Sequence, residues 1–132
     1  MISESKSADQ VFSDKDAFEI LADNVFRWGV ARNITLEGGA TPLSQIKKLK
    51  EEVQEIEEGL ISGNRKEVVD GIGDSLVVLL MICRLTGIDL VDALRVAYGE
   101  IKDRKGKMIN GIFVKESDLN NEQTKWIYKG EE

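Results

Sequence analysis

The sequence of 132 residues predicts an all-α protein, on two observations. Four segments carry apolar residues at alternating three- and four-residue spacing, the periodicity of a helix with one buried face. Short breaker segments separate them, so that consecutive helices can pack against each other. We therefore predict a four-helix bundle over residues 13–115, with a flexible tail at residues 1–12 and a C-terminal extension at residues 116–132.

Local sequence signals predict where the first two helices begin and end. The first is expected to begin near Asp14 or Asp16 and to run to about Arg32, where a segment with two glycines ends it. Thr41-Pro42 then has the form of an N-cap followed by proline at the first helical position. The second helix is expected to continue to about Leu60.

The third and fourth helices follow after brief turns. Ser62-Gly63-Asn64 is a turn sequence, and the third helix is expected from Arg65 to Leu85. Asp89 is a suitable N-cap for the fourth helix, which is expected to end near Gly106. The run Ile112-Phe113-Val114 is the one strand-like segment that we identify.

Composition restricts the possible chemistry. The chain has no histidine, which excludes a Ser-His-Asp or Cys-His mechanism and a His-ligated zinc site. Its single cysteine, Cys83, lies in an apolar run and is expected in the core of a protein from a reducing compartment. Any catalysis must therefore rest on carboxylates, lysines, arginines and a metal ion.

Charge and hydropathy restrict the partners. With 24 acidic and 18 basic residues, the net charge is −6 and no basic block is present. We therefore expect no binding to duplex nucleic acid or to a membrane through charge alone, although a metal ion could screen a polyanion. The longest apolar stretch, Leu76–Cys83, is far shorter than the roughly 18 residues of a membrane span. Since the first ten residues are polar, we expect a soluble, cytoplasmic protein.

The second helix carries three acidic residues on one side. Glu55 follows Glu52 by three residues and Glu51 by four, so the three side chains project over adjacent turns. Such a group is commonly a solvated helix face, so it does not by itself define a site.

The third helix carries acidic residues in an otherwise apolar segment. Between Gly71 and Leu85 it has ten apolar residues and two charged ones, so most of its surface should be buried. Asp70 and Asp74 share one face of this helix, and Glu67 lies one turn earlier. Two ionised carboxylates there would repel each other, and a divalent cation relieves this repulsion. Oxygen ligands favour Mg²⁺ or Mn²⁺. The alternative is an ion pair with Lys or Arg from another helix.

The fourth helix ends in a basic run that includes Lys102, Arg104 and Lys105. Cations are favourable at any helix C-terminus, which is the simpler explanation. The functional explanation is that these residues contact phosphate oxygens beside the metal. A site of this kind supports the attack of an activated water on phosphorus.

Three segments together resemble the MazG-like nucleotide pyrophosphohydrolases. They are Gln45–Glu55, then Gly73-Asp74-Ser-Leu-Val-Val-Leu, then Ile101-Lys-Asp-Arg-Lys-Gly106. The resemblance spans roughly residues 18–115. It implies a helical core that assembles into dimers or tetramers. It also implies hydrolysis of nucleoside triphosphates, often deoxy or damaged forms, to monophosphate and pyrophosphate.

The resemblance also implies residue roles. Glu52 and Glu55 match the metal-binding glutamates of the first motif, and Asp74 matches the aspartate of the second. Lys102, and Arg104 or Lys105, fall near the basic phosphate contacts of the family.

This sequence departs from the family pattern at Gly71, because the family usually has an acid three residues before the aspartate. Asp70 is the expected substitute, about 6 Å along the helix axis from Asp74 at 1.5 Å per residue. Glu67-Val-Val-Asp70 fits the same pattern, so both pairs stay open, as does the number of metal ions.

We therefore expect a nucleotide pyrophosphohydrolase that uses Mg²⁺, held by Glu51, Glu52, Glu55, Asp70 and Asp74. Glu52 or Glu55 would orient or deprotonate the attacking water. The alternative hypotheses are a nucleotide-binding regulator without turnover and a structural helical adaptor.

The remaining expectations concern the base and the assembly. Trp28 is a candidate for stacking on a base, although a core position fits it better, and Asn110 is a candidate sugar or phosphate contact or a turn residue. The apolar surface of the third helix predicts a homo-dimer or homo-tetramer. The alternative is that the C-terminal segment around Ile112, Phe113, Val114, Trp126 and Tyr128 folds back and covers that surface.

Overall fold

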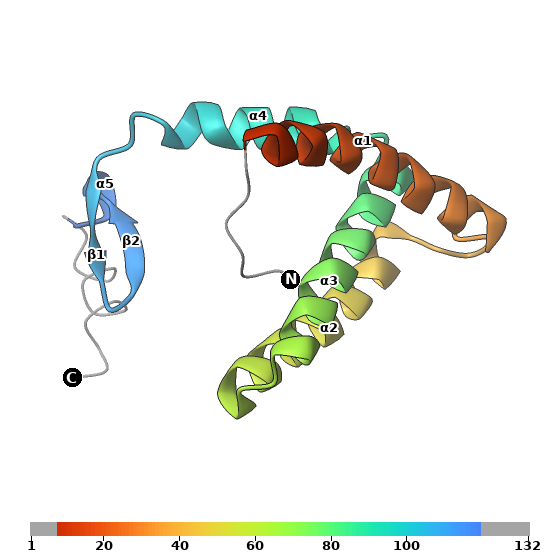
Figure 1. Cartoon of the computed structure of the whole chain (residues 1–132), viewed down its shortest axis with the longest axis horizontal. Helices are drawn as coiled ribbons and strands as arrows, with labels where there is room; N and C mark the ends of the chain where they lie inside the picture. Colours follow the sequence, from red (N-terminus) through yellow and green to blue (C-terminus); the bar gives the residue numbers. More distant parts are fainter. Residues whose placement is uncertain (1–7, 120–132) are drawn as a thin grey trace. The chain divides into compact units, whose positions relative to one another are not determined.

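The computed structural model describes the backbone of residues 8–119 and the side chains of residues 17–119 (Figure 1). Contacts within the chain divide it into two compact units, Met1–Leu90 and Val91–Glu132. The described part is mainly helical, as the sequence predicts, with one small β-hairpin. Among the described residues, no helix combines the length and hydrophobicity that a bilayer span requires.

The first unit contains three helices, α1 (Ala8–Ala31), α2 (Pro42–Ser62) and α3 (Arg65–Thr86). α2 and α3 form a helical hairpin with contacts along its length, and α1 packs on α3 (Figure 1). α1 begins at Ala8, so the start predicted near Asp14 or Asp16 is too late. The sequence offers an N-cap residue at both of those positions, but the helix continues through them.

The ends of α2 follow from local chemistry. The Ser44 N–H donates to Thr41 Oγ1 and the Thr41 N–H donates to Ser44 Oγ, both at 3.0 Å. This reciprocal capping box, with Pro42 at the first helical position, confirms the predicted start. Gly63 ends the helix with a φ of 72°, a left-handed conformation that glycine adopts without steric cost.

α3 carries the core of the first unit. Asn64 caps its start by accepting a hydrogen bond from the Glu67 N–H at 3.2 Å, and Gly87 ends it in the left-handed conformation. The helix supplies most of the buried apolar side chains. Cys83 is among them and is a free thiol, which confirms its expected place in the core. The buried apolar residues of α3 are Val78, Leu80, Met81 and Cys83.

The second unit contains most of α4 (Leu90–Ile101), then β1 (Gly106–Ile109), β2 (Ile112–Lys115) and α5 (Glu116–Leu119). The two strands pair antiparallel, from Gly106 opposite Lys115 to Ile109 opposite Ile112. The strand predicted at residues 112–114 is confirmed. The predicted end of the fourth helix near Gly106 is wrong, because that residue begins β1.

The hairpin turn explains one candidate site residue. Asn110 and Gly111 join the strands with φ values of 50° and 81°. Two consecutive positive φ values are typical of a two-residue hairpin turn, for which Asn-Gly is the preferred sequence. Asn110 is therefore a turn residue of the second unit. Trp126 and Tyr128 lie outside the described residues.

Candidate active site

Three carboxylates from the two helices of the hairpin come together. Glu52 and Glu55 project from adjacent turns of α2, and Asp74 projects from α3. One carboxylate oxygen of each lies within 4.8 Å of the others. The spacing in the sequence puts the two glutamates on one face, and the pairing of α2 with α3 adds the aspartate.

Glu52 is the unusual member of this group. Its exposed fraction is 4%, and among the described residues it is the one charged residue that is buried. Oε1 lies 3.1 Å from Lys48 Nζ, whereas the buried Oε2 has no hydrogen-bond partner among the described residues. A buried carboxylate oxygen without a donor is costly. An all-oxygen group with one such atom fits a hard divalent cation.

The protonation of the two glutamates is linked. The hydrogen bond from Lys48 is the main cause that lowers the pKa of Glu52, against the opposing effect of burial. The pKa of Glu55 is raised by its contact with Glu52, and more weakly by the negative charges of Glu67 and Asp74. Because neither ionised carboxylate can donate, the Glu52–Glu55 contact is a hydrogen bond only when one is protonated.

An open pocket of about 370 Å³ lies beside the group, between α2 and the start of α3. Four of its six lining side chains are acidic, so it has an excess of negative charge. Its lining residues are Glu55, Asn64, Lys66, Glu67, Asp70 and Asp74.

The structure gives a physical reason for glycine at position 71. Gly71 is buried where α3 crosses α2, and a Cβ there would lie 2.6 Å from Ile56 Cγ1 and 3.3 Å from Ile56 N. An acidic side chain therefore cannot fit without moving α2. Glu67 and Asp70 both line the pocket that Asp74 lines, so both predicted acidic pairs face it. Asp74 is the one that joins the close group with Glu52 and Glu55.

Two other predicted residues lie apart from this group. Glu51 is exposed and 3.6 Å from Lys48 Nζ, on the outer side of the Lys48–Glu52 ion pair. Trp28 of α1 is 42% exposed rather than in the core, and the Arg32 guanidinium carbon lies 4.8 Å from its ring centroid. One face of the indole thus carries a cation–π contact with Arg32, which directly follows α1.

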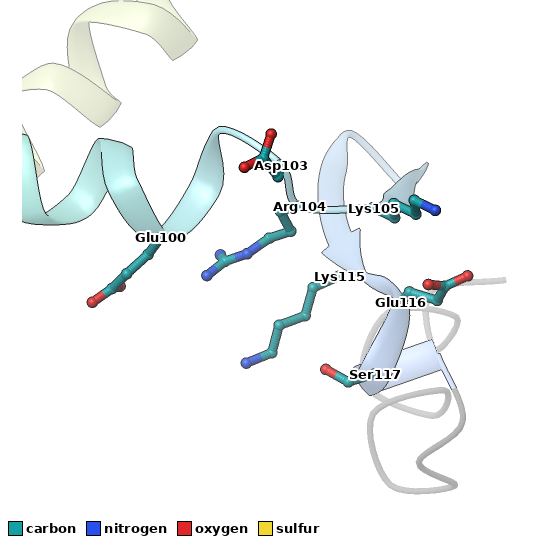
Figure 2. A pocket seen from close by; sticks show the side chains of 7 residues that line it. All are labelled: Glu100, Asp103, Arg104, Lys105, Lys115, Glu116 and Ser117. Carbon is teal, nitrogen blue, oxygen red and sulfur yellow. The ribbon is translucent and has the colours of Figure 1, made fainter.

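The basic residues belong to the second unit. Arg104 and Lys105 line a pocket of about 380 Å³, and the Glu116 N–H donates to the Lys105 carbonyl oxygen at 2.7 Å. Figure 2 shows the side chains of Arg104 and Lys115 extending in one direction with Glu100, whereas Lys105 points away. Lys102 follows α4 and is not a lining residue of this pocket.

Sequence reasoning missed two basic residues that the structure places at these sites, Lys48 and Lys115. Lys48 precedes Glu52 by four residues, a spacing that brings side chains together on a helix. The Asn-Gly turn predicts the strand pairing that brings Lys115 back beside Arg104. Both signals were present in the sequence.

Fold and site together define a mainly helical protein with an all-carboxylate group on a helical hairpin. A family model of the MazG nucleotide pyrophosphohydrolase domain matches residues 40–108, just over half of the chain. The chain therefore belongs to this family, which confirms the resemblance seen in its motifs. The match includes the three carboxylates and the basic run after α4. Searches of curated proteins and of solved structures gave no significant match.

Proposed function

We propose that this protein hydrolyses nucleoside triphosphates, with deoxynucleotides as the expected class, to nucleoside monophosphate and pyrophosphate. The observation that carries the proposal is the buried, unpartnered Oε2 of Glu52 beside the carboxylates of Glu55 and Asp74. Membership of the MazG family supports the same reaction.

The proposed cofactor is Mg²⁺, with Mn²⁺ as a substitute. Glu52, Glu55 and Asp74 would hold it, and Asp70 and Glu67 lie on the same pocket for a further ligand or a second ion. When bound, such an ion polarises phosphate oxygens and lowers the pKa of water.

The two glutamates have different proposed roles because their environments differ. Glu52 is tied to Lys48, which lowers its pKa and makes it a poor proton acceptor. Glu55 is exposed and lines the open pocket beside the group, where its carboxylate can act on a water. We assign to Glu55 the orientation and deprotonation of the water that attacks the α-phosphorus, with pyrophosphate as the leaving group.

The proposed phosphate contacts are Arg104, Lys105 and Lys102, with Lys115 added by the structure. Arg104 and Lys115 lie side by side in their pocket, so their charges can act on one group of phosphate oxygens (Figure 2). Trp28 keeps an exposed indole and is a candidate contact for the base.

The proposed assembly is a homo-dimer or homo-tetramer built on α3. Val69, Ile72 and Leu79 are 36%, 56% and 38% exposed and follow a spacing of three and seven residues. This spacing puts them on one stripe of the helix. A second copy would bury the stripe and could complete the four-helix core.

Pyrophosphate release from the eight common nucleoside triphosphates, measured with Mg²⁺, tests the proposed function. Glu55→Gln should abolish release, whereas Glu57→Gln, which removes an exposed charge from the same helix, should not. Hydrolysis that is undiminished in excess chelator would contradict the cation site. Tight nucleotide binding without release would favour the regulator over the enzyme.

A further inference from the structure

The first observation concerns how Glu52 is held. Lys48 and Glu52 are one turn apart on α2, and the Lys48 ammonium lies 3.1 Å from Oε1. The two partners differ in environment, since the side chain of Lys48 is 57% exposed and that of Glu52 is 5% exposed. The ion pair therefore joins a solvated ammonium group to a buried carboxylate, and it engages Oε1 of Glu52 and not Oε2.

The second observation is that the other oxygen of Glu52 is left open. Oε2 is buried and has no hydrogen-bond partner among the described residues. Glu55 and Asp74 face Glu52 with acceptors only and cannot satisfy it when ionised. The carboxylate thus has one oxygen held by a donor and one available to a cation.

We propose that Lys48 is a positioning residue for the cation site, holding Oε1 of Glu52 so that Oε2 is presented to the metal. The inference rests on the proposed function, because it assumes that Glu52 is a metal ligand. Residues that orient a ligand by a hydrogen bond commonly affect metal affinity by about 10- to 100-fold. Lys48 does so from the helix that carries the ligand, so the orientation is set before any ion arrives.

Lys48 also has an effect that opposes metal binding. A positive charge near the site also repels a divalent cation, and on this ground alone its removal would tighten binding. Lys48 is more than half exposed, so water and salt screen this repulsion. The hydrogen bond to a buried carboxylate oxygen is screened less. Positioning should therefore outweigh repulsion.

Calorimetric titration of the metal-free chain with Mn²⁺ tests the proposal. Lys48→Met should weaken binding by about 10-fold or more. Lys48→Arg, which retains a donor and the charge, should restore most of the affinity. Lys47→Met is the matched control, because it removes the same charge from the adjacent position and should leave the affinity nearly unchanged. Circular dichroism of each variant establishes that the helices are retained.

A double-substitution cycle links the effect to Glu52. In the Glu52→Gln background, Lys48→Met should cause little further loss of Mn²⁺ affinity, because the partner that Lys48 positions is gone. Unchanged or tighter binding by Lys48→Met in the otherwise native chain would overturn the positioning role and leave the proposed function intact. An absence of Mn²⁺ binding by the native chain would instead remove the metal site itself.

Discussion

The close approach of α2 and α3 can be tested with two glycines of one helix. Gly71 is buried at the crossing, where an added Cβ would lie 2.6 Å from Ile56 Cγ1. Gly73, two residues on, is exposed, and an added Cβ there would have no neighbour within 4 Å. Gly71→Ala and Gly73→Ala therefore add the same methyl group to the same helix in opposite environments.

The expected magnitudes follow from this difference. Replacing an exposed helical glycine by alanine stabilises by about 1 kcal/mol, so Gly73→Ala should raise the free energy of unfolding by that amount. Gly71→Ala has the same gain, but crowding a packed contact costs about 1–3 kcal/mol. The backbone nitrogen of Ile56, 3.3 Å from the added atom, limits how far α2 can adjust. The two variants should differ by about 1–3 kcal/mol.

Urea denaturation of the metal-free chain, followed by circular dichroism, measures the difference without relying on activity. Gly71→Ala should unfold at a lower urea concentration than Gly73→Ala, with a similar dependence on urea. Equal stability of the two variants would refute the close contact, and with it the explanation for the missing acid at position 71.

The further predictions concern the charges and the assembly. Asp74→Asn should abolish turnover without lowering the stability of the metal-free chain, whereas a loss of about 3–5 kcal/mol in denaturation would indicate a salt-bridge partner instead. The pKa of Glu55 is raised above its ordinary value of 4.5. Mn²⁺ affinity, measured by calorimetry, should therefore fall as the pH drops through this raised pKa, because a proton on Glu55 competes with the metal. The same shift should make the metal-free chain less stable as the pH rises through this range, since the folded form binds that proton more tightly than the unfolded form. A flat pH profile of Mn²⁺ affinity would contradict the raised pKa of Glu55. Sedimentation at low micromolar concentration should show a dimer or tetramer, and a stable, active species of 14.7 kDa would refute the oligomer.

The helices and their ends were largely predictable, because their signals are local. Thr41-Pro42 forms a capping box, and the turn sequence at residues 62–64 separates α2 from α3 as predicted. The start of α1 was misplaced because Asp14 and Asp16 are compatible with an N-cap and also with a helix interior. The hairpin was missed although Asn110-Gly111 is a strong turn signal, because the apolar content of β1 is low.

The candidate site was predictable in its members but not in its arrangement. Spacing along each helix identifies which acids share a face, which gave Glu51, Glu52 and Glu55 on one helix and Asp70 and Asp74 on the other. The family resemblance then singled out Glu52, Glu55 and Asp74. It does not say which of them is covered by neighbouring residues, and burial is what makes Glu52 differ from Glu51. That distinction depends on how α2 rests on α3, a tertiary property that periodicity in one helix does not contain.

Gly71 connects the packing of the hairpin with its chemistry. Asp74 can join the two glutamates of α2 because α3 approaches α2 closely one turn earlier, and that approach requires a residue without a side chain. An acid at position 71 would crowd Ile56 and push the helices apart, which would carry Asp74 away from Glu52. Asp70, one position earlier, avoids the crossing and still lines the pocket. We propose that the departure from the family pattern keeps this close contact, and that Asp70, on the pocket side of the helix, supplies the carboxylate that position 71 lacks.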